Sequence, residues 1–128
     1  MLPSLCINLG KDEQQTLLDI ARRSISHGLE TGQALPIEVL QLSDKLKIDS
    51  AVFVTLTRGG ELRGCIGSLQ AVDPLARAVS NSAFNAAFRD RRFGKVEASE
   101  LDELRIEISV LSALVPVNVD SRQALLDA

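Results

Sequence analysis

Within the segment 104–112, hydrophobic and polar residues alternate strictly from Leu104 to Val110. The apolar side chains would face one side of an extended chain and the polar ones the other: Leu104, Ile106, Ile108 and Val110 against Arg105, Glu107 and Ser109. Because successive side chains of a strand point to opposite faces, this period of two predicts a strand with one buried face. Pro116 is expected to end it.

Two further extended segments surround a pair of glycines. Residues 51–57 (AVFVTLT) are rich in β-branched side chains, and residues 62–66 (LRGCI) follow after Gly59 and Gly60. A two-residue glycine loop between two such runs is a strong signal for a β-hairpin. The sequence therefore predicts two antiparallel strands joined by a tight turn.

One helix is predicted before the hairpin along the chain and another after it. Over residues 12–26 apolar positions recur at helical spacing, and Gly28 is expected to end this helix, with His27 as an ordinary capping residue. A second helix is expected over residues 74–88, with Asp73 as its N-cap and a proline at its first position.

The chain between positions 29 and 50 has a weaker pattern. It contains Pro36 and scattered polar residues, so a loop is expected, with one helical turn near residues 38–42. The order of elements is then helix, hairpin, helix and strand. This order predicts an α+β fold with at least one antiparallel strand pair.

Composition limits the class of protein. With 128 residues, of which 45% are hydrophobic and 24% charged, the chain matches a single globular domain rather than a disordered segment. Its 17 acidic residues exceed its 14 basic ones, which gives a formal net charge of −3. Because nucleic-acid affinity depends mainly on Lys and Arg at phosphates, this balance argues against a dedicated nucleic-acid binder. The aromatic residues are four phenylalanines, so base-stacking platforms of Tyr or Trp are absent.

Cysteine content and the N-terminal segment indicate a cytoplasmic protein. Cys6 and Cys65 are too few for the disulfide framework of a small secreted domain. The first residues lack the pattern of a signal peptide, and no apolar run approaches the roughly 20 residues that span a membrane. A single histidine and no Cys-x-x-Cys pair argue against a metal site, and no cofactor fingerprint is present.

Residues 62–67 (LRGCIG) carry more chemistry than a plain strand needs. With a period of two, Arg63 and Cys65 would share one face, while Leu62 and Gly64 would share the other. A guanidinium beside a thiol favours the thiolate, which is the nucleophilic form. The alternative is structural, with Cys65 as a small buried residue and Gly64 making room for packing. The residues alone leave both alternatives open.

Two other groups are candidates for chemistry. His27 is the single histidine that could serve as the base for a cysteine nucleophile, although capping is its more ordinary role. Residues 89–95 contain four basic residues and one acidic residue, a net charge of +3. They form either a solvated loop balanced by the acidic residues of 97–103 or the rim of an anion-binding site near Arg63 and Cys65.

Three blocks of the sequence resemble a known family. The Arg-Gly-Cys-Ile-Gly strand at 63–67, the Phe-Arg-Asp-x-Arg-Phe loop at 88–93 and the Ile-Glu-Ile-Ser-Val-Leu-Ser strand at 106–112 follow the order of the AMMECR-type domain. This domain is named for the Alport syndrome, midface hypoplasia and elliptocytosis chromosomal region protein. The similarity extends from about Asp12 to the end of the chain. It implies an α+β domain with helices packed around a curved, largely antiparallel sheet.

The chain departs from the family pattern at two places. The family loop normally reads Asp-Pro-Arg-Phe, and Arg91 stands at the position of the proline. Family members also carry a further C-terminal part, with a Gly-rich strand pair and a closing helix. We therefore expect residues 1–128 to form one domain that is incomplete at its C-terminal end, where a strand edge or apolar sheet surface is left uncovered. Residues 1–10 are expected to be disordered.

The resemblance implies no established activity, so two functions are carried forward. The first is a binding or regulatory module in the cytoplasm that acts with a Memo-type protein and a radical-SAM protein, the family's genomic companions. The second is a cysteine-dependent enzyme in which Cys65 attacks a small anionic substrate and Arg63 holds the thiolate or the substrate. Self-association into a homo-oligomer is left open.

Residues that match the family motifs make up the candidate site. Cys65 is the catalytic candidate, and the candidate binding residues are Arg63, Gly64, Ile66, Gly67, Asp90, Arg92 and Phe93. No metal ligand and no cofactor are expected, and neither nucleic acid nor a membrane is expected as a partner.

Overall fold

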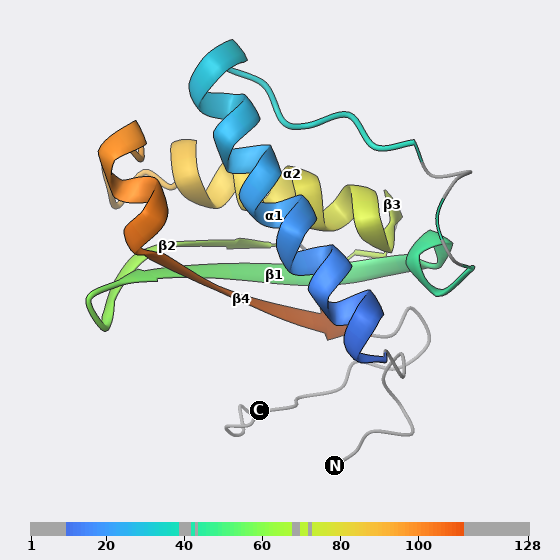
Figure 1. The fold of residues 1–128 in the computed structure, drawn as a ribbon. Helices are drawn as coiled ribbons and strands as arrows, with labels where there is room; N and C mark the ends of the chain where they lie inside the picture. The colour runs from blue at the N-terminus through green and yellow to red at the C-terminus, as the bar shows by residue number, and fades with distance from the viewer. Residues whose placement is uncertain (1–9, 39–41, 43, 68–69, 72, 112–128) are drawn as a thin grey trace.

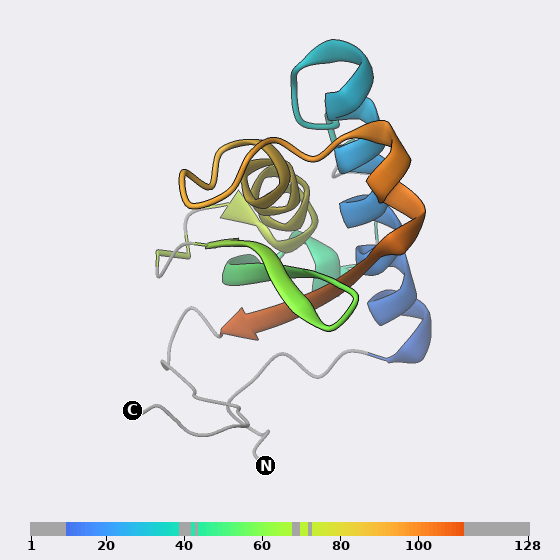
Figure 2. The ribbon, with the colours of Figure 1, turned by 90° about the vertical axis from the view of Figure 1, so that its left-hand side faces the viewer.

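Helices and strands follow one another in the predicted order. The computed structural model describes residues 10–38, 42, 44–67, 70–71 and 73–111. Its elements are α1 (Lys11–Thr31), the 3₁₀ helix η3 (Asp44–Lys47), β1 (Asp49–Arg58), β2 (Glu61–Gly67), β3 (Asp73–Pro74), α2 (Leu75–Phe88), the 3₁₀ helix η4 (Ala98–Glu103) and β4 (Leu104–Leu111). Both α-helices lie on one side of the sheet (Figures 1 and 2). The α+β prediction is confirmed.

Strand β1 is the centre of an antiparallel sheet. Its residue Phe53 faces Gly67 of β2 on one edge and Ser109 of β4 on the other. The two-residue strand β3 pairs with the start of β1. The predicted hairpin is confirmed: Gly59 and Gly60 connect β1 to β2 with φ values of 60° and 84°, which only glycine adopts readily.

The hydrophobic core lies between the sheet and the two helices. On β1 the even-numbered side chains Val52, Val54 and Leu56 are buried. Those of Ile106, Ile108 and Val110 on β4 pack against the same core, which confirms the predicted alternation. The odd-numbered side chains of β1 point to the opposite face, and no helix of the described residues packs there (Figure 2). We call this the helix-free face.

Helix α2 lies very close to the sheet because its contact surface is built from small residues. Ala83, Ala86 and Ala87 of α2 are all buried, where the helix packs against α1, β1 and β2. Opposite them, Gly64 of β2 contacts the backbone of Ala86 so closely that a Cβ at Gly64 would overlap the Ala86 carbonyl oxygen. The glycine is therefore required by the approach of the helix.

The first helix is longer than predicted. It passes Gly28 and ends at Thr31, where Gly32 takes a left-handed φ of 78° and its N–H donates to the Gly28 carbonyl. Gly28 instead lies under the rings of Phe84 and Phe88 of α2, where a Cβ would approach them to 2.5–2.9 Å. The prediction of a helix end at Gly28 was wrong, because a long-range contact, not a cap, requires the glycine.

The start of the second helix also differs by one residue. Asp73 and Pro74 pair with β1 as strand β3, and the helix begins at Leu75 with Pro74 in the N-cap position. No side chain caps this end, so the role predicted for Asp73 is not observed. Instead the Leu75 N–H donates to the carbonyl of Ile48, which ties the helix start to the sheet.

Several expectations fall outside the described residues. Most of the turn expected near 38–42, the strand end at Pro116 and nearly all of the segment 1–10 belong to this part of the chain. Within the described residues β4 pairs along one edge only, with β1. The expected incompleteness of the domain concerns residues that follow β4, and it stays a prediction.

Gly64→Ala is expected to lower the free energy of unfolding by about 2–3 kcal/mol, because the new methyl group must push α2 away from β2. Urea unfolding followed by circular dichroism measures this change. Gly94→Ala is the matched control, since a Cβ there meets nothing within 4 Å, and its effect should stay within about 0.5 kcal/mol. Equal effects of the two substitutions would contradict the packing role of Gly64.

Candidate functional site

A β-bulge in strand β2 determines where the motif residues point. The pairing of β2 with β1 shifts between Gly64 and Leu62, which leaves Arg63 as the extra residue. Leu62 therefore faces Thr57 and shares the helix-free face with Cys65, not the core face with Gly64. The strict alternation predicted for this segment was wrong here, because the bulge shifts the period by one residue.

Cys65 is half-exposed, and its thiol lies beside a threonine. Its Sγ is 3.3 Å from Oγ1 of Thr55, the residue directly opposite on β1. The backbone N–H and carbonyl of Cys65 point away from β1, toward the outer edge of β2. There the Cys65 N–H donates to Oδ2 of Asp90 at 3.0 Å, and its carbonyl accepts from Nη2 of Arg92 at 3.3 Å. Two side chains thus bind this edge as a neighbouring strand would.

Asp90 and Arg92 form an ion pair that holds this contact. Nη2 of Arg92 is 2.7 Å from Oδ2 of Asp90, and Nε and the backbone N–H of Arg92 donate to Oδ1. The pKa of the buried Asp90 carboxyl lies well below its usual range because of the Arg92 hydrogen bonds and then the Cys65 N–H. The same pair raises the pKa of Arg92, whose guanidinium also lies 5.4 Å from the Phe93 ring centre. Candidate residues from two distant blocks therefore bind each other.

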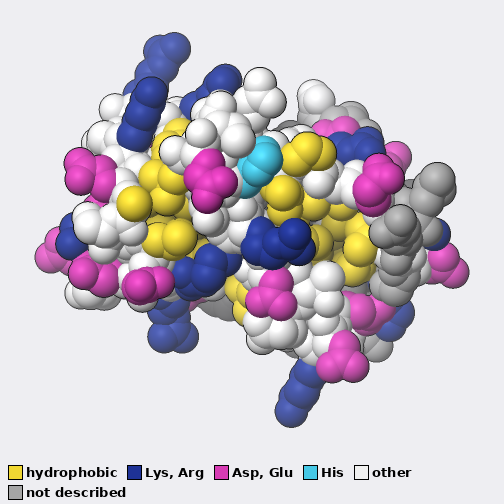
Figure 3. All heavy atoms as spheres, turned by 45° about the horizontal axis from the view of Figure 1, so that its top comes forward, with side chains coloured by type: hydrophobic (Ala, Val, Ile, Leu, Met, Phe, Trp, Pro, Cys, Tyr) yellow, Lys and Arg dark blue, Asp and Glu magenta, His cyan; other side chains and the backbone are white. Residues whose placement is uncertain are grey.

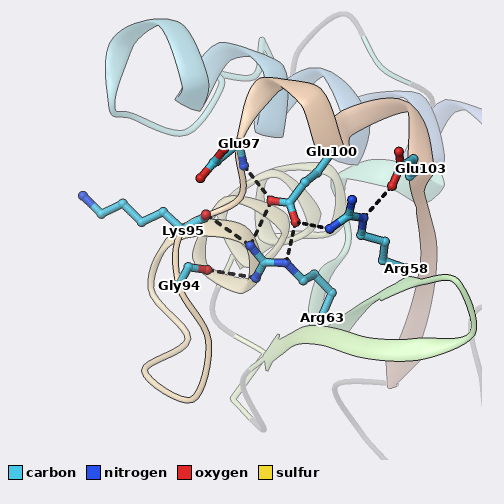
Figure 4. Close-up of polar contacts among 7 residues, drawn as sticks. All are labelled: Arg58, Arg63, Gly94, Lys95, Glu97, Glu100 and Glu103. Atoms are coloured by element: carbon cyan, nitrogen blue, oxygen red, sulfur yellow. Dashed lines mark hydrogen bonds and ion pairs between the residues drawn. The ribbon is translucent and has the colours of Figure 1, made fainter.

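Arg63 leaves the sheet at the bulge and binds a buried carboxylate (Figure 4). Its Nε and Nη2 donate to the two oxygens of Glu100, each at 3.0 Å. Its remaining donors reach the carbonyls of Gly94, at 2.8 Å, and Lys95, at 3.1 Å. The guanidinium thus has four acceptors, and the thiol of Cys65 is not among them.

Glu100 accepts further hydrogen bonds and is the centre of an ion cluster with Arg58, Arg63 and Glu103. It accepts from the N–H of Glu97 at 2.8 Å and from Nη1 of Arg58 at 3.1 Å, while Arg58 also bonds Glu103 (Figure 4). The hydrogen bonds from Arg63, followed by the Glu97 N–H, lower the pKa of Glu100 from 4.5 to about 2. The bond to Glu103 raises the pKa of Arg58.

Sequence reasoning did not single out Glu100. In one of the two alternatives for the basic loop 89–95, the acidic residues of 97–103 balance that loop. In the structure Glu100 and Glu103 instead pair with Arg58 and Arg63 of the hairpin. The available signal was the capping-box spacing between Glu97 and Glu100 at the start of η4.

The remaining motif residues on β2 contribute to packing. Ile66 is half-buried against the core, and Gly64 admits α2 as described above. Gly67 lies against the β1 backbone, where a Cβ would come within 2.6 Å of the Phe53 Cα. These contacts explain why glycine stands at both positions.

Other candidate features lie apart from this cluster. His27 is half-buried within α1, one turn before the helix ends. Among the described residues no three His, Cys, Asp or Glu side chains gather as metal ligands, and neither α-helix is long and apolar enough to cross a bilayer. On the side viewed in Figure 3, Lys and Arg alternate with Asp and Glu and do not form a basic surface.

Comparison with known proteins identifies relatives of this chain. The AMMECR1 family model matches residues 18–127. A protein from Methanothermobacter thermautotrophicus is 41% identical over 113 residues, covering 88% of this chain and 58% of the relative. One from Aeropyrum pernix is 41% identical over 107 residues, covering 80% and 45%.

A solved structure shares the fold. The uncharacterised protein PH0010 from Pyrococcus horikoshii superposes with a TM-score of 0.66 at 37% sequence identity, over 73% of this chain and 48% of its own. The chain thus spans about half the length of the relatives it matches.

Glu100→Gln is expected to lower the free energy of unfolding by about 3 kcal/mol at pH 7, because it leaves Arg63 without its buried partner. Since folding lowers the pKa of Glu100, the stabilisation is complete above pH 4.5 and is lost as the pH falls toward 2. Urea midpoints of the wild type should therefore decline over this window more steeply than those of Glu100→Gln.

Glu103→Gln is the matched control for this experiment. Glu103 belongs to the same cluster, but its side chain is 55% exposed, so the substitution should change the free energy of unfolding by no more than about 1 kcal/mol. Parallel pH profiles for the wild type and Glu100→Gln would show that Glu100 does not carry the effect.

Proposed function

The chain belongs to the AMMECR1 family, and we propose that it is a binding or regulatory module that acts with a Memo-type protein and a radical-SAM protein. Its recognition surface in this proposal is the helix-free face of β2, around Leu62 and Cys65. The observation that carries the proposal is the bulge, which brings an exposed leucine onto the same face as the half-exposed cysteine.

Rigidity of the strand supports this role. Strand β2 is bound by β1 along one edge and by Asp90 and Arg92 along the other, and Arg63 attaches its bulge to η4. The backbone of such a strand has little freedom to lose when a partner binds. The polar atoms of the motif thus hold the surface in place, and its exposed side chains are left to meet the partner.

The chemical character of the surface also supports a protein partner. Leu62 is 44% exposed, and it is one of two large hydrophobic side chains of the described residues with such exposure. Arg105 and Glu107 lie on the same face of β4 and are well exposed. An apolar centre with a charged border is typical of protein–protein interfaces.

Leu62→Arg is expected to weaken retention of the Memo-type or radical-SAM partner at least about tenfold, because a charge replaces the apolar contact. Quantitative pull-down with the purified partners measures it. Ile48→Arg is the matched control, since Ile48 is the other exposed large hydrophobic residue, at 45%, and it should leave retention unchanged. Equal retention of Leu62→Arg and the wild type would remove this face from the proposal.

A cysteine-dependent enzyme acting on a small anionic substrate is the second candidate. It is supported by the half-exposed thiol of Cys65 and by the guanidinium of Arg92, which donates to the backbone carbonyl of Cys65. The donors of Arg63 are occupied by Glu100, Gly94 and Lys95, so Arg92 would hold the anionic group in its place.

Cys65→Ser separates the two functions. A binding module should keep its partner affinity within about twofold, because a serine hydroxyl can still bond Thr55. Wild-type protein should show no turnover of the probe p-nitrophenyl phosphate. Turnover that disappears in Cys65→Ser would favour the enzyme, since only the thiolate is the nucleophile.

A further inference from the structure

The loop between α2 and η4 is rich in basic residues. Arg92 is paired with Asp90, but Arg89, Arg91 and Lys95 have no carboxylate partner among the described residues. The guanidinium of Arg89 instead lies 5.5 Å from the ring centre of Phe84. Three positive charges therefore remain available on a short segment of a chain whose formal net charge is −3.

These cations surround a pocket that also has aromatic walls. It has a volume of about 530 Å³ and is lined by the rings of Phe88 and Phe93 together with Arg89, Asp90, Arg91, Gly94 and Lys95. Asp90, the single acidic residue in the lining, directs its carboxylate to Arg92 and Cys65. The pocket thus combines two half-buried rings with an excess of positive charge.

Backbone contacts give this loop a fixed shape. The Phe93 N–H donates to the Asp90 carbonyl at 3.0 Å, and the Val96 N–H donates to the Ala87 carbonyl at 2.9 Å. Arg63 holds the next two carbonyls, those of Gly94 and Lys95. A pocket that is formed before its ligand arrives loses little entropy on binding.

We propose that this pocket binds a small ligand that carries a phosphate or carboxylate group on a flat ring. The anionic group pairs with Arg91 and Lys95, which are exposed and can reach it from two positions of the loop. The ring packs on Phe93 or Phe88, since aromatic faces prefer offset or edge contacts with another ring. This site uses other side chains than the partner surface at Leu62, so either one can exist without the other.

Phenyl phosphate is a small probe that contains both features. Titration of the protein, followed by amide-resolved NMR, should give saturable shifts in residues 88–96. Inorganic phosphate and benzyl alcohol, which each lack one feature, should bind at least about tenfold more weakly. Binding should also weaken with added salt, because the cations are exposed. No saturation by about 10 mM phenyl phosphate, or equal binding of benzyl alcohol, would overturn the proposal.

The double substitution Arg91→Gln and Lys95→Gln should lower the affinity for phenyl phosphate at least about tenfold. Arg105→Gln is the matched control, since Arg105 is 81% exposed on β4, outside the pocket, and it should leave the affinity unchanged. An equal loss of affinity in the double variant and in Arg105→Gln would show that the attraction is nonspecific, and it would overturn the proposal. Unchanged thermal unfolding of the variants establishes that they are folded.

Discussion

The ion pair between Arg63 and Glu100 is the contact on which the arrangement of the motif residues depends. It joins the bulge of β2 to η4, the helix that leads directly into β4, and Arg63 also holds the carbonyls of Gly94 and Lys95. One buried pair thus positions the hairpin, the loop after α2 and the start of the last strand. Because both groups are largely buried and have further hydrogen-bond partners, losing either one would leave an unpaired charge.

The motif residues of the sequence mostly bind one another or pack against neighbouring backbone. Asp90 and Arg92 bind the backbone of Cys65, Glu100 binds Arg63, and the glycines of β2 admit neighbouring backbone. Segments far apart in the sequence, around Cys65, Asp90 and Glu100, therefore form one framework. The proposed partner surface contains only one of these motif side chains, that of Cys65, beside the exposed Leu62 that precedes the Arg-Gly-Cys-Ile-Gly motif. A motif in this domain indicates what holds the site in place more directly than what the site binds.

Local pattern predicted the strands and the hairpin, because alternation and the Gly-Gly turn are properties of adjacent residues. It did not predict the end of α1, since Gly28 is required by rings 56 and 60 residues further along the chain, those of Phe84 and Phe88. Nor did it predict the bulge or the partner of Arg63. Such features arise from tertiary contacts, and a single sequence does not show which charges will meet.

Exposure divides the charges of this region into two groups with different physical behaviour. The side chains of Arg63 and Glu100 are 16% and 10% exposed, so salt screens their attraction weakly and their pairing belongs to the folded state. Arg91 and Lys95 are exposed, contribute no ion pair to the described framework and act on solutes through a screened field. The outer charges can therefore change to suit a ligand without loss of the fold, because the buried pair already satisfies the framework.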